Sequence, residues 1–72
     1  MSTLETFAIT VGETAGAIWK LLDERGSLAT TQIIKEIDAP RDQIMQSIGW
    51  LAREGKLTIR EQGRRKIATL LD

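Results

Sequence analysis

Between Thr30 and Lys66 the chain shows two helical patterns followed by two strand-like patterns, an order that few small folds accommodate. The first part, TTQIIKEI, spaces its isoleucines as a short helix does. Pro40 ends that helix and suits the start of another, RDQIMQSIGWLARE, which predicts a longer helix stopping at Gly55. The segments KLTIRE and KIATLL then alternate as two strands around a turn at Gln62-Gly63.

An earlier amphipathic helix is predicted from about Val11 to Arg25, ending at Gly26. Its apolar stripe consists of Val11, Ala15, Ile18 and Leu22, and Trp19 beside this stripe is expected in the core. Residues 27–29 are predicted to form a short strand that pairs with the hairpin, and Thr30 or Thr31 to cap the following helix.

The leading segment, residues 1–10, has three open interpretations. It frays, it extends the first helix, or it supplies Leu4, Phe7 and Ile9 to a partner subunit. The last alternative is attractive because a chain of 72 residues without cysteine has a small core, and association would add to its stability.

The net charge of zero hides a polarised distribution. Residues 1–40 hold three basic and six acidic side chains, a charge of −3, whereas residues 41–72 hold seven basic and four acidic ones, a charge of +3. Positive charge therefore gathers on the longer helix and the hairpin, where a polyanion would be bound.

The order of the elements predicts one α+β domain over residues 1–72, a winged helix-turn-helix of three helices and a small antiparallel β-hairpin, the wing. From Gly12 through Ile67 the chain resembles a family of small bacterial and archaeal winged helix-turn-helix domains of unknown function. The resemblance rests on GETAGAIWKLL, on IGWLAREGKL and on the basic hairpin. It implies the winged-helix fold and a DNA-binding role, and it implies no ligand.

Several functional classes are disfavoured by what the sequence lacks. Without histidine, cysteine or tyrosine the chain has neither the usual catalytic pairs nor the usual zinc ligands, and its scattered glycines form no phosphate-binding loop. We therefore expect no enzyme, no cofactor, no metal and no small-molecule ligand. No apolar run is long enough to cross a bilayer, so a cytoplasmic protein without membrane contact is expected.

The start of the longer helix supplies the first candidate DNA contacts. Arginine can pair with guanine, glutamine with adenine, and serine with bases or phosphates. The predicted contacts are Arg41, Gln43, Gln46 and Ser47. Ordinary solvent-facing polarity would explain the same residues equally well.

The tip of the hairpin supplies the second set. Arg64, Arg65 and Lys66 are consecutive, and such a cluster repels itself unless an anion such as a phosphate backbone lies against it. A solubilising tip that prevents pairing between sheet edges is the alternative.

Two functions remain open at this stage. The favoured one is a homodimeric regulator of transcription that binds double-stranded DNA, with the longer helix in the major groove and the wing on phosphates. The alternative is a winged-helix module for protein interaction or dimerisation that binds no DNA. In both, Phe7, Ile9 and Trp50 form the predicted dimer interface, although Trp50 suits the core equally well.

Overall fold

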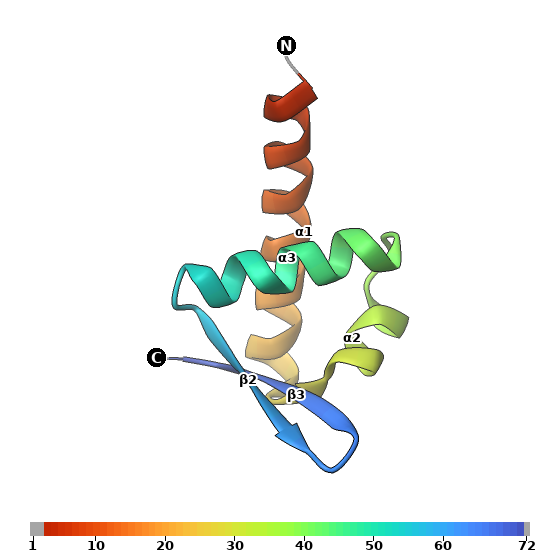
Figure 1. Cartoon of the computed structure of the whole chain (residues 1–72), viewed down its shortest axis with the longest axis vertical. Coiled ribbons are helices and arrows are strands. Elements are labelled where there is room, and N and C mark those ends of the chain that lie inside the picture. The colour runs from red at the N-terminus through yellow and green to blue at the C-terminus, as the bar shows by residue number, and fades with distance from the viewer. Residues whose placement is uncertain (1–2, 72) are drawn as a thin grey trace.

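The computed structural model describes the backbone of residues 3–71 and the side chains of residues 7–71. Three helices and a three-stranded sheet make up this part of the chain, which confirms the predicted α+β winged helix-turn-helix (Figure 1). In chain order the elements are α1 Thr3–Arg25, β1 Leu28–Ala29, α2 Thr30–Glu36, α3 Arg41–Arg53, β2 Leu57–Gln62 and β3 Arg65–Leu70.

The first helix is longer than predicted, because α1 begins at Thr3 and not near Val11. Residues 3–10 therefore extend the first helix and do not fray, and their contact with a partner subunit stays a prediction. Phe7 lies four residues before Val11, so the apolar spacing of the stripe continues into this segment. No proline interrupts it, and the cost of Gly12, about 1 kcal/mol relative to alanine, is too small to end a helix.

The helix-turn-helix is formed by α2 and α3, joined through residues 37–40. The predicted threonine cap of α2 is wrong, because the residue before the helix is Ala29 and no side chain caps it. Thr30 is instead the first residue of the helix and is buried. The C-terminal end of α3 is closed by a Schellman motif. The backbone amide of Gly55 donates to the carbonyl oxygen of Ala52, and the backbone amide of Lys56 donates to the carbonyl oxygen of Leu51. The positive φ of 72° at Gly55 permits this ending and turns the chain into β2.

The sheet has the strand order β1-β3-β2, with both pairs antiparallel. The predicted short strand is confirmed, since Leu28 pairs with Ala68 and Ala29 with Ile67. Gln62 pairs with Arg65 across a two-residue turn in which only Gly63, the first central residue, has a positive φ, 65°. That pattern corresponds to a type II′ turn, whose twist matches that of the two strands.

The core lies where the three helices meet the sheet. Its largest fully buried side chains are Ile18, Leu22, Ile33, Ile44 and Leu57. Trp19, which was predicted to lie in the core, is 42% exposed, so that prediction is wrong. Consecutive helix residues diverge by about 100°, so Trp19 points away from the stripe that contains Ile18.

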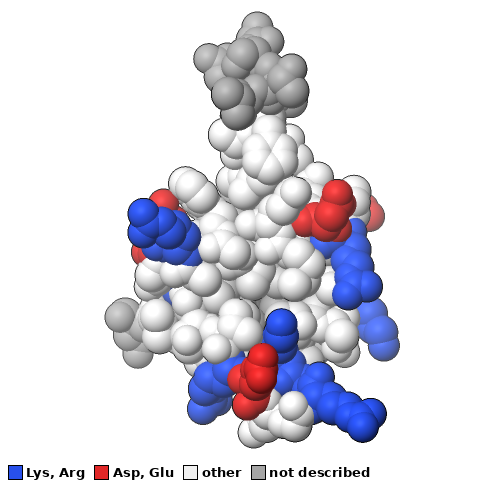
Figure 2. Space-filling model, viewed as in Figure 1, with Lys and Arg blue, Asp and Glu red and all other residues white. Residues whose placement is uncertain are grey.

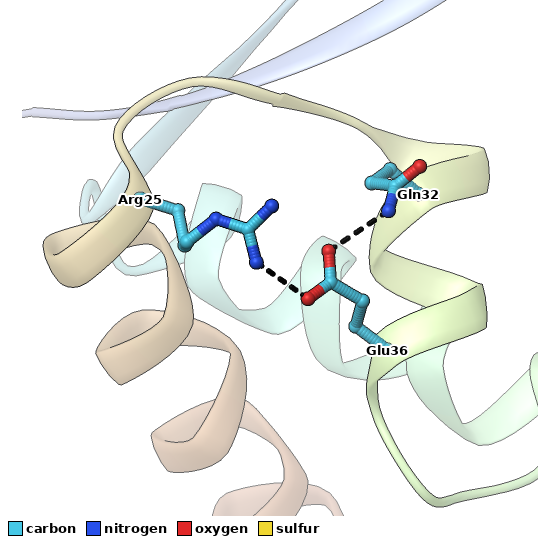
Figure 3. Close-up of polar contacts among 3 residues, drawn as sticks. All are labelled: Arg25, Gln32 and Glu36. Carbon is cyan, nitrogen blue, oxygen red and sulfur yellow. Dashed lines mark hydrogen bonds and ion pairs between the residues drawn. The ribbon is translucent and has the colours of Figure 1, made fainter.

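One ion pair joins α1 to α2, and it is the only one among the described side chains, those of residues 7–71 (Figure 3). The Arg25 guanidinium donates to Glu36 at 2.6 Å, and the side-chain amide of Gln32 donates to the other carboxylate oxygen at 2.9 Å. The hydrogen bonds from Gln32 and Arg25 lower the pKa of Glu36 from its usual value of 4.5. The contact fixes the end of α1 against the first helix of the helix-turn-helix.

We predict that Glu36→Gln lowers the free energy of unfolding at neutral pH and that its deficit shrinks in acid. Because the pKa of Glu36 is lower in the folded state, its contribution is present above 4.5 and is lost as the pH falls through the folded value. Urea denaturation of parent and variant from pH 7 down to acid measures the difference. Glu24→Gln, at an exposed position on the same helix as Arg25, is the control. At pH 7 it should lower the free energy of unfolding by less than Glu36→Gln does. A deficit that grows in acid would contradict the assignment.

Candidate nucleic-acid interface

The buried and exposed residues of α3 form two opposite stripes. Ile44, Ile48 and Leu51 face the core. On the other side, Asp42, Gln46, Gly49 and Arg53 are all exposed and follow one another at helical spacing. We call these four residues the outer stripe of α3. Ala52 is exposed as well.

Of the four contacts predicted on α3, two are available at the surface and two face the protein. Arg41 and Gln46 are exposed. Ser47 is completely buried, and its hydroxyl donates to the carbonyl oxygens of Gln43, at 2.8 Å, and of Val11 on α1, at 3.2 Å. A buried hydroxyl cannot reach DNA, so the prediction of Ser47 as a DNA contact is wrong.

Gln43 is half-buried and is engaged within the protein. Its side-chain amide donates to the hydroxyl of Thr14 on α1 at 2.7 Å. This hydrogen bond holds the side chain against α1 and away from the outer stripe. Gln43 therefore positions α3, and we no longer include it in the candidate interface.

The strand register separates the three basic residues at the hairpin tip. Lys66 lies opposite Glu61, so an acidic side chain on the same face of the hairpin offsets its charge. Arg65 lies opposite Gln62, on the other face, and Arg64 occupies the turn. Arg60 shares the face of Arg65, because residues two apart on a strand point the same way.

Sequence reasoning missed Arg60 and Arg53, both of which are exposed. The alternation along β2 places Arg60 on the face of Gln62, which pairs with Arg65. Arg53 follows Gln46 by seven residues, which is two helical turns. Periodicity alone could therefore have identified both residues.

Positive charge lies at the two ends of α3 and over the hairpin, as Figure 2 shows for one face of the molecule. The middle of α3 carries no charge, since residues 43–52 include no charged residue. The seven basic residues from Arg41 to Lys66 are all exposed, and none of them forms an ion pair within the described part of the chain. Their charges remain available to an external anion.

The residues predicted for the dimer interface are also exposed. Phe7 is 50% exposed, Ile9 49% and Trp50 48%, which excludes Trp50 from the core. Phe7 and Trp50 line one apolar groove together with Ala8, Val11 and Gly12. Ile9 does not line this groove, so the structure brings together two of the three residues.

No group of three or more histidine, cysteine, aspartate or glutamate side chains within residues 7–71 is placed to hold a metal ion. None of the described helices is long and apolar enough to cross a membrane.

We predict that Ser47→Ala lowers the free energy of unfolding by about 1 kcal/mol, because a buried hydrogen bond between α3 and α1 is lost. Urea denaturation measures this change. Ser27→Ala is the matched control, because the hydroxyl of Ser27 is hydrogen-bonded to that of Thr69 at an exposed position. Its loss should lower the free energy of unfolding by less. If Ser47→Ala cost no more than the control, the hydroxyl would not be a structural contact.

The comparisons with known proteins agree with this geometry. Residues 5–70 match the family model described as winged helix-turn-helix domain (DUF2582). A comparison with curated protein sequences finds no match. Among solved structures, HlyU from Vibrio cholerae N16961 superimposes with a TM-score of 0.66 at 18% identity, over 100% of this chain and 83% of the other, a likeness of fold. The chain therefore belongs to the winged helix-turn-helix domain family DUF2582, whose function is unknown.

Proposed function

We propose that this chain binds double-stranded DNA and regulates transcription, with the outer stripe of α3 in the major groove and the hairpin on the phosphate backbone. The observation that supports this most strongly is the set of seven exposed, unpaired basic side chains at the ends of α3 and on the hairpin. Salt-dependent contact with phosphates requires charges of this kind.

The outer stripe of α3 is suited to reading bases. Within this stripe, Gln46 can form two hydrogen bonds with adenine and Arg53 two with guanine, and Arg41 at the start of the helix can also pair with guanine. Residues 43–52 carry no carboxylate, so the nearest ones are Asp42 and Glu54 at the two ends of the helix. Asp42 accepts a hydrogen bond from the backbone amide of Gln43 at 2.9 Å, so its carboxylate is turned toward its own helix end.

The hairpin is suited to binding phosphates without reading sequence. Arg60 and Arg65 share one face and Arg64 stands at the turn, so the three guanidinium groups surround the tip. Guanidinium groups bind phosphate in a two-pronged geometry. Lys66 contributes less in this proposal, because Glu61 lies opposite.

The alternative, a protein-interaction module without DNA binding, draws support from the exposed apolar side chains of Phe7, Trp19 and Trp50. It treats the basic hairpin tip as a solubilising feature only. The two proposals differ in one measurable respect: the affinity of the chain for duplex DNA at low salt.

We predict that Arg65→Glu weakens binding to all duplex sequences and reduces the slope of log affinity against log salt by about 0.9, because one phosphate contact is lost. Fluorescence anisotropy with labelled duplexes over a range of salt concentrations measures both quantities. Lys20→Glu, at an exposed position on α1, changes the net charge equally and is the control. Equal affinities for the two variants would reject the hairpin as a phosphate contact, and no binding by the parent would favour the alternative function.

We predict that Gln46→Ala relaxes base preference at one position and costs about 1–3 kcal/mol on the preferred sequence. Selection of bound duplexes from a random pool gives the preference of parent and variant. Gln43→Ala is the control, because it removes the same type of side chain from the side of α3 that faces α1. It should lower the free energy of unfolding and leave the base preference unchanged. A change of preference only in Gln43→Ala would place the reading face elsewhere.

A further inference from the structure

The N-terminal half of α1 projects beyond the rest of the molecule (Figure 1). Val11 is 7% exposed, whereas Phe7, one turn earlier on the same stripe, is 50% exposed. A few turns of helix have little stability in water unless their apolar face packs against something. The apolar stripe of α1 thus continues past the point where its own domain covers it.

Two adjoining hollows lie along α1 on either side of Trp50, and Gly12 lines both. We call them together the α1 trough. Of the side chains around it, Lys56 alone is charged. The residues of the trough are Phe7, Ala8, Val11, Gly12, Ala15, Gly16, Trp19, Trp50, Leu51 and Lys56.

We propose that the α1 trough binds a second copy of this chain in a two-fold symmetric dimer. Such an interface places one patch against itself, so the patch must hold both projections and hollows. Phe7, Trp19 and Trp50 are the projections, all between 42% and 50% exposed. Gly12 and Gly16 line the hollows, and a Cβ atom placed on either one would meet nothing within 4 Å. A partner aromatic side chain has room above each glycine.

The exposed area supports the same conclusion. The chain has an accessible surface of 5169 Å². A folded monomer of this mass exposes roughly 4,500 Å², so the excess is on the order of 700 Å². Each partner in a stable complex of ordinary size buries about 800 Å². The excess is of the same order as the area that one partner buries.

This inference does not depend on DNA binding. Trp50 lies on the flank of α3 that faces α1, where it lines the trough with Gly12. Gln46 and Arg53 of the outer stripe lie one helical turn from Trp50, so the outer stripe adjoins the trough. None of the four outer-stripe residues lines the trough, and Lys56 is the one basic residue from Arg41 to Lys66 that does.

The decisive variant is Gly12→Gln/Gly16→Gln. The new side chains enter open space in the monomer and improve helix propensity, so the monomer should fold at least as well as the parent. They fill the hollows of the trough, so the dissociation constant of the dimer should rise roughly tenfold or more. Sedimentation velocity from low to high micromolar concentration measures this constant, and circular dichroism confirms folding.

Ala17→Gln is the matched control, because Ala17 is exposed on α1 outside the trough, and it should dimerise as the parent does. Phe7→Ala is a second variant that should weaken the dimer by removing a projection. A parent that stays monomeric at high micromolar concentration overturns the proposal, and so does a dimer that the glycine variant leaves unchanged. Arg65→Glu should dimerise normally, so loss of DNA binding and loss of dimerisation are observed separately.

Discussion

The crossing of α3 over α1 is the contact on which the rest of the structure depends. Apolar packing by Ile44 and Ile48 holds the two helices together, but such packing alone tolerates small rotations of a helix about its axis. The Ser47 hydroxyl on Val11 and the Gln43 amide on Thr14 remove that freedom, because hydrogen bonds require defined directions. The rotation of α3 in turn decides which of its polar residues face outward.

The fold was predictable because each of its elements is specified locally. Isoleucine spacing indicates α2 and α3, the residue before Pro40 cannot continue a helix, and Gly55 and Gly63 stand where the backbone requires a positive φ. Strand alternation indicates the hairpin. Even the two-residue β1 was predictable, because the short segment lies between two helices and can pair with the free edge of the hairpin. These signals are short-range, so a single sequence contains most of them, and the start of α1 and the cap of α2 are the exceptions.

The candidate interface was only partly predictable, because it depends on contacts between elements. Ser47 and Gln46 are adjacent polar residues, but Ser47 lies three residues after Ile44 and four before Leu51, on the inward stripe, where its hydroxyl contacts α1. Trp19 is exposed because it points about 100° away from the stripe that contains Ile18. Arg60, in contrast, was predictable from the sequence, because strand alternation places it on the same face as Arg65. It was missed because it is not consecutive with the three basic residues at the tip.

The position of Trp50 has a consequence for how the two proposed activities influence each other. This residue belongs to the helix that would enter the DNA groove, yet its side chain lines the surface that would receive a second copy. Because one helix carries both surfaces, any shift of α3 that improves one contact also changes the other, so the two binding events would be coupled. Thermodynamic linkage then requires DNA to favour association as strongly as association favours DNA. Occupancy of a DNA site would respond steeply to the abundance of the protein, with no effector needed.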